Sequence, residues 1–128
     1  MKNIDSLGDF FAEIGNILIQ ESGEIGDQIF IYREFESGVI GGVSFKEFDD
    51  HVEWLDTDSV DDYMLRFWES LPISDRWKAI RYSISGSKFQ AELDYGEDWV
   101  DGEVMDDRVL RIEKARFGNR RIDYGELP

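Results

Sequence analysis

The sequence predicts an α+β fold in which an antiparallel sheet is built from two hairpins and helices pack on one face. Three observations favour this class. The expected elements follow the order α-β-β-(β)-α-β-β-α, so strands succeed one another as hairpins. Apolar residues alternate with period two in some segments and recur at helical spacing in others. The 128 residues, 41% hydrophobic with nine Phe, five Tyr and four Trp, suffice for one core, so we expect a single domain over 1–128 with a C-terminal tail at 119–128.

The first third of the chain predicts a helix followed by a hairpin. Residues 5–20 form an amphipathic pattern, with apolar positions at Leu7, Phe10, Phe11, Ile14, Ile17 and Leu18. QIFIYREF and VIGGVSFKEF are typical of strands, and Gly38 supplies the positive φ that a three-residue loop between them needs. Gly41 and Gly42 weaken the second strand, or mark a bulge or the close approach of another element. HVEWL predicts a short third strand.

The middle of the chain predicts a second helix over 57–71. Thr57 or Asp58 is a suitable cap, Asp61 and Asp62 suit the first turn, and Pro72 lies where the helix should end. Its apolar stripe consists of Val60, Met64, Phe67, Trp68 and Leu71. A stripe at this spacing is typical of core packing, so it indicates no cofactor site.

The clearest local pattern is a second hairpin over 77–95. A two-residue loop at Gly86 and Ser87 sets Ile84 opposite Phe89, and Arg81 opposite Glu92. Most apolar residues of both arms then share one face, so hydrophobic pattern and charge agree on this register. After an acidic loop, EVMDDRVLRIEKARFG predicts a last helix that ends near Gly118, with a basic residue, Arg116, at the negative end of its dipole.

The charge balance limits the possible partners. The formal net charge is −15, so the surface repels phosphate backbones and anionic lipid and attracts basic partners. We therefore expect no direct binding of nucleic acid or membrane. The first residues carry neither a basic region followed by an apolar stretch nor a cleavage site, and the chain has no cysteine, which agrees with a cytoplasmic protein.

Catalytic and metal-binding patterns are weak, so we expect no enzyme activity, metal or cofactor. The single histidine, His51, stands on an expected strand whose neighbouring residues Asp49 and Asp50 point to opposite faces. DTDSVDD lacks the glycine and closing glutamate of a calcium loop, and its acids suit helix capping. The glycines of SGVIGGVS lack the spacing of a phosphate-binding loop.

The remaining candidate is a protein-binding surface in GEDWVDGEVMDD, where Trp99, Val100 and Met105 stand among acids. Aromatic anchors ringed by charge suit an interface. The predicted partner-binding residues are Asp94, Tyr95, Glu97, Asp98, Trp99, Asp101, Glu103, Asp106 and Asp107. The alternative is that the Trp99 ring packs into the core and the acids cap the last helix.

One region of the sequence resembles a known family. WKAIRYSISGSKFQAELDYGED, residues 77–98, combines a tryptophan, an apolar strand, a GxKF-type turn and a strand ending in DY and acids. This combination, and the order of elements around it, resembles the YezG-like immunity proteins. The chain departs from that pattern before the first strand, where Pro and Trp are missing, and in the last helix, which has no tryptophan.

The resemblance implies an immunity protein, or antitoxin, that binds and neutralises a basic bacterial toxin domain, often a nuclease. The oligomeric state of the protein would be a monomer or a homodimer. The net charge is compatible with this function, because nucleases have basic clefts. The alternative is an acidic nucleic-acid mimic or adaptor that acts on a basic DNA- or RNA-binding protein, with carboxylates spaced like phosphates over a long face.

Overall fold

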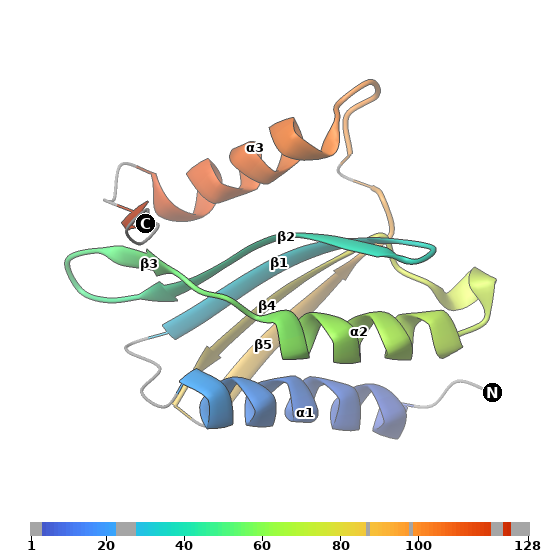
Figure 1. Cartoon of the computed structure of the whole chain (residues 1–128). Coiled ribbons are helices and arrows are strands. Elements are labelled where there is room, and N and C mark those ends of the chain that lie inside the picture. Colours follow the sequence, from blue (N-terminus) through green and yellow to red (C-terminus); the bar gives the residue numbers. More distant parts are fainter. Residues whose placement is uncertain (1–3, 23–27, 87, 98, 119–121, 124–128) are drawn as a thin grey trace.

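The computed structural model describes residues 4–22, 28–86, 88–97, 99–118 and 122–123, and shows one sheet between two helical layers (Figure 1). The helices are α1 (Ile4–Ser22), α2 (Asp58–Ser70) and α3 (Met105–Phe117), with a 3-10 turn at Ile73–Asp75. The strands are β1 (Gln28–Glu36), β2 (Val39–Glu47), β3 (Val52–Trp54), β4 (Ala79–Ser85), β5 (Lys88–Asp94) and β6 (Ile122–Asp123).

The predicted α+β class and the order of its elements are confirmed, including the short third strand. The sheet has the order β5-β4-β1-β2-β3-β6. Its first five strands pair antiparallel, and the two-residue β6 pairs parallel with β3. β6 falls within the segment expected to be a tail, so part of that segment joins the sheet.

The larger core lies between the sheet and the layer of α1 and α2 (Figure 1). Residues of the two helices, such as Phe10 and Met64, pack there with sheet residues such as Ile31 and Ile80, all fully buried. The predicted stripes of both helices supply this contact. Their aromatic rings stack closely, with the centroids of Phe10 and Phe67 4.2 Å apart.

The third helix lies on the opposite face of the sheet (Figure 1), so the expectation that all helices pack on one face is wrong for α3. Its Ile112 and Phe117 cover Phe30 and Phe45, and the Phe45 and Phe117 rings meet edge to face at 5.1 Å. The physical reason is that β1 is buried on both faces from its second residue to its eighth. Such a strand needs cover on each side.

The second hairpin has the predicted register throughout. Ile84 pairs with Phe89, and Arg81 pairs with Glu92, with 4.0 Å between the Arg81 Nε and Glu92 Oε1 atoms. Gly86 has a φ of 60°, as a tight turn requires. Ser87, the other predicted loop residue, lies outside the described residues.

The first hairpin is tighter than predicted. Glu36 pairs with Val39, so two residues rather than three form the turn, and Gly38 there has a φ of 74°. The predicted close approach occurs at Gly42, where a Cβ would lie 2.0 Å from the backbone oxygen of Tyr32. The pairing of β1 with β2 continues through this position without a bulge.

The helix ends follow the predictions in part. Thr57 occupies the N-cap position of α2, but its hydroxyl makes no capping bond. Gly118 ends α3 with a φ of 58°, as expected. No helix among the described residues is both long and apolar enough to span a bilayer.

Candidate functional site

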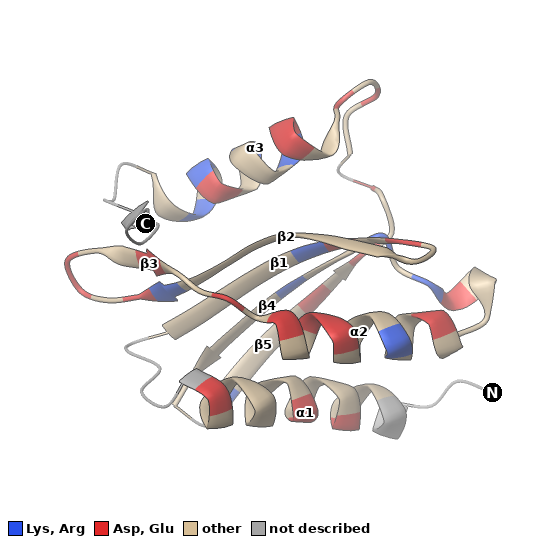
Figure 2. Cartoon of the chain, viewed as in Figure 1, with Lys and Arg blue, Asp and Glu red and all other residues tan. Residues whose placement is uncertain are grey.

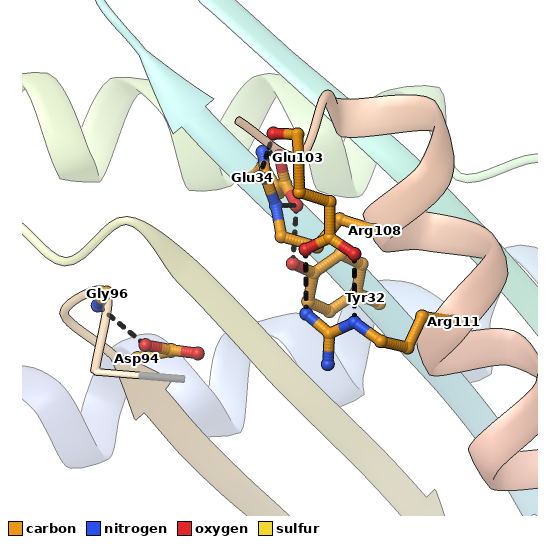
Figure 3. A network of polar contacts seen from close by, with 7 residues as sticks. All are labelled: Tyr32, Glu34, Asp94, Gly96, Glu103, Arg108 and Arg111. Carbon is orange, nitrogen blue, oxygen red and sulfur yellow. Dashed lines mark hydrogen bonds and ion pairs between the residues drawn. The ribbon is translucent and has the colours of Figure 1, made fainter. Parts of the chain in front are cut away.

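The connection between β5 and α3, residues 95–104, is the predicted binding segment, and its described part is held by turns. The Asp94 carboxylate accepts a hydrogen bond from the Gly96 backbone N–H at 2.6 Å (Figure 3), and Gly96 has a φ of 102°. The Glu97 carboxylate accepts one from the Tyr95 N–H at 3.1 Å. The Glu103 N–H donates to the Val100 carbonyl, also at 3.1 Å. These bonds give the segment a defined course.

A buried ion pair holds the start of α3 beside this connection (Figure 3). Arg108 donates from Nε and Nη2 to the two carboxylate oxygens of Glu34, at 2.5 and 2.7 Å. The Tyr32 hydroxyl donates to the same carboxylate at 2.5 Å. Burial and the neighbouring Glu34 carboxylate raise the pKa of Tyr32 well above its ordinary value. Hydrogen bonding to Glu34 raises the pKa of Arg108. The network is therefore a fixed anion–cation pair.

The same arginine fixes Trp99. Its guanidinium lies 3.6 Å from the centroid of the indole ring, and the Lys78 ammonium lies 5.3 Å from it. The ring also packs against the core beneath α3. A cation held over an aromatic face in this way adds to stability. The Trp99 side chain is thus part of the fold, as the alternative interpretation of the sequence had it.

A second ion pair closes the connection onto α3. Arg111 donates from Nε and Nη2 to the two carboxylate oxygens of Glu103, at 3.0 and 2.9 Å (Figure 3). The hydrogen bonds from Arg111 lower the pKa of Glu103. The Glu103 carbonyl also accepts a bond from Arg108 Nη1 at 3.0 Å. Glu103 therefore faces its own chain.

The structure divides the predicted binding residues into two groups. Asp94, Trp99 and Glu103 are engaged in contacts within the chain and shape the connection. The exposed group consists of Tyr95, Glu97, Asp101, Asp106 and Asp107. Asp98 lies outside the described residues.

Two valines add an apolar component to the exposed group. Val100 is 59% exposed and Val104 is 60% exposed, and Tyr95 nearby in the chain is 47% exposed. The sequence prediction placed the interface anchor at Trp99 and missed Val104. The available signal was that each valine adjoins one acid, Val100 before Asp101 and Val104 after Glu103, but exposure of a single valine is not predictable from the sequence.

The arginines of α3 form ion pairs with glutamates of the same chain. Arg116 donates to the buried Glu47 at 2.7 Å, in addition to the pairs formed by Arg108 and Arg111. By contrast, the outer surfaces of α1 and α2 expose many acids (Figure 2). They include Asp9, Glu13, Glu21, Asp58, Asp62 and Glu69. The neighbouring charge of Asp56 raises the pKa of Asp58.

A groove of about 650 Å³ separates α3 from β4 and β5. Its polar lining includes Arg81, Ser83, Gln90 and Glu92.

His51 lies away from this groove, bonded through its ring nitrogens to Asp50 and Glu53 at 2.6 and 2.9 Å. Among the described residues, no group of three or more His, Asp or Glu side chains converges on a point that could hold a metal ion.

A scan of the chain against models of protein families finds no match, and a search of curated proteins finds none either. The resemblance of residues 77–98 to the YezG-like immunity proteins therefore stays a prediction that depends on those residues.

Proposed function

We propose that this protein is an immunity protein that binds and neutralises a basic bacterial toxin domain in the cytoplasm. The observation that carries the proposal is the exposed surface of the β5–α3 connection. There the exposed acids Glu97, Asp101, Asp106 and Asp107 lie close in sequence to the exposed apolar side chains of Val100 and Val104, on a backbone held by turns. Ordered apolar residues inside a charged rim are the usual composition of a protein interface.

Charge supports a basic partner. The chain has a net charge of −15, and Arg108 and Arg111 beside the connection, like Arg116 at the far end of α3, are already paired with glutamates. The exposed acids are therefore available to attract cations. Nuclease domains have basic clefts, so a nuclease is the class of toxin that this surface suits best.

Preorganisation supports tight binding by the same surface. The Arg111 pair and the hydrogen bond from Arg108 hold Glu103 at the end of the turn before α3, so less conformational freedom remains to be lost on binding. The resemblance of residues 77–98 is the reason for choosing a toxin among possible basic partners.

The test is co-expression with the protein encoded immediately upstream, since antitoxin genes commonly follow their toxin genes. The expected result is rescue of growth and recovery of a complex. A variant carrying Glu97→Gln, Asp101→Asn and Asp107→Asn should lose rescue, whereas the matched variant Asp9→Asn, Glu13→Gln and Glu21→Gln on α1 should keep it. A folded protein that neither binds nor rescues would remove the proposal.

A second candidate function is supported by the acids of α1 and α2. They extend over the outer surface of both helices (Figure 2), as a nucleic-acid mimic or adaptor for a DNA- or RNA-binding protein requires. Under this alternative, the variant of Asp9, Glu13 and Glu21 would lose binding to the basic partner and the variant of the connection would retain it. The two functions therefore predict opposite outcomes for the same pair of variants.

A further inference from the structure

The two edges of the sheet differ in a way that points to self-association. At one edge, the strands β3 and β6 are three and two residues long. At the other edge, β5 has seven residues, all paired with β4 in one unbroken register. Natural sheets usually shorten, bulge or cover their edges, because an exposed regular edge can pair with another strand. Within the described residues, the outer edge of β5 carries no further strand.

The residues of β5 face suitable partners when the strand pairs antiparallel with β5 of a second copy of the protein. If two copies of β5 pair antiparallel about Ala91, Lys88 of one copy faces Asp94 of the other, and Gln90 faces Glu92. These four side chains share the α3 face of the sheet, since Glu92 and Asp94 pair with Arg81 and Ala79. We propose that β5 is the interface of a symmetric homodimer in which the two sheets join into one.

The opposite face of the strand is also complementary. In the same register, Phe89 of one copy faces Leu93 of the other, and the two Ala91 side chains meet at the two-fold axis. Phe89 is 39% exposed, and its ring lies 6.2 Å from that of Phe11 on α1. A second copy would cover this apolar edge of the core. The interface would thus combine backbone hydrogen bonds, an apolar row and two kinds of polar pair.

Charge on an edge strand can also serve to prevent pairing, which is the competing explanation for Lys88 and Glu92. The distinction lies in the register. The register centred on Ala91 pairs all seven residues of β5, whereas the register centred on Gln90, which also sets Lys88 opposite Glu92, pairs only five of them. The proposal does not depend on the proposed function, because it concerns the protein alone.

The first test is sedimentation velocity over a range of protein concentrations, with changes at Gln90. Gln90→Glu places like charges opposite each other twice in the dimer, so the Kd for dimerisation should rise on the order of tenfold. Gln90→Lys places a cation opposite Glu92 and should lower the Kd by a similar factor. Gln20, exposed on α1, gives matched controls: Gln20→Glu and Gln20→Lys repeat the charge changes away from the edge.

The second test uses the absence of cysteine in the chain. Ala91→Cys places two thiols opposite each other at the axis, within the spacing that a disulfide requires, so oxidation should give a cross-linked dimer. Gln20→Cys should give none under the same conditions. A protein that stays monomeric at every concentration, or a dimer that neither responds to Gln90 changes nor cross-links through Ala91→Cys, would overturn the proposal.

Discussion

Arg33 and Glu34 are neighbours on the central strand β1, and each forms an ion pair with a helix on a different face of the sheet. Arg33 Nε donates to Asp61 of α2 at 2.9 Å, and its Nη2 donates to Ser44 and Thr57. Glu34 binds Arg108 of α3. Successive side chains of a strand point to opposite faces. This dipeptide therefore orients both helical layers.

Removing the charge of Glu34 should destabilise the protein strongly. Glu34→Gln leaves the Arg108 guanidinium buried without a counter-charge, so the free energy of unfolding should fall by about 3 to 5 kcal/mol. Urea denaturation measures the change. Asp62→Asn, which breaks the exposed pair with Arg66, is the control and should cost less than about 1 kcal/mol. Similar losses for the two variants would contradict the assigned role of Glu34.

Alkaline conditions should destabilise the protein through Tyr82. Its hydroxyl donates to the Phe11 carbonyl at 2.8 Å, and burial raises its pKa above the ordinary value of 10.0. The folded state thus keeps a proton that the unfolded state releases. The stabilisation is complete below pH 10.0 and is lost as pH rises above it.

Urea denaturation between about pH 8 and about pH 12 measures this effect. Tyr82→Phe should lower stability by about 1 kcal/mol at neutral pH, because the hydrogen bond is lost, and should give a shallower decline at high pH. The Tyr32 hydroxyl, whose pKa is also raised, should cause part of the decline that remains. An unchanged alkaline slope in Tyr82→Phe would show that this tyrosine stays neutral in both states or ionises in both.

The second hairpin was predictable because two independent signals agreed. The alternation of residues 79–94 and the Arg81–Glu92 pair fix the same register, and a slip by one residue would turn the apolar side to solvent. The position of α3 was harder to predict. Its buried side includes Arg108 and Glu113 as well as Ile112 and Phe117, so its apolar stripe is weak. The unused signal was β1, whose FIYREF sequence is buried on both faces.

The candidate site, too, could be predicted from the sequence only in part. An acidic exposed segment between β5 and α3 follows from the sequence, and Glu97 and Asp101 are exposed there. The inward orientation of Trp99 and Glu103 depends on Arg108 and Arg111, which approach from the following helix. Such tertiary contacts have no local pattern, so sequence reasoning could only leave the two interpretations of Trp99 open.

Gly42 should tolerate no side chain, whereas Gly38 should tolerate one at moderate cost. Both have positive φ, but a Cβ at Gly42 would collide with the Tyr32 backbone oxygen, and nothing lies within 4 Å of one at Gly38. Gly42→Ala should therefore reduce stability by about 3 kcal/mol or more, and Gly38→Ala by about 1 kcal/mol. Thermal and urea unfolding of the two variants compare them directly. Equal losses would show that the β1–β2 pair can separate at Gly42.

The exposed and inward residues of the β5–α3 connection should have different effects on binding of a basic toxin domain. Neutralising Glu97, Asp101 and Asp107 together should lower the association rate on the order of tenfold and flatten its dependence on salt, because solvent ions screen separated charges. Val100→Ala with Val104→Ala should mainly raise the dissociation rate, because exposed apolar residues inside a charged rim act as anchors.

Trp99→Ala should act through the fold instead. It removes a ring packed beneath Arg108, so it should lower the free energy of unfolding by about 2 kcal/mol. Stopped-flow and surface-binding kinetics with the upstream gene product separate the two rates, and urea denaturation reports stability for each variant. If the valine variant bound normally while Trp99→Ala raised dissociation without loss of stability, the indole rather than the valines would be the anchor, and the connection would have to rearrange on binding.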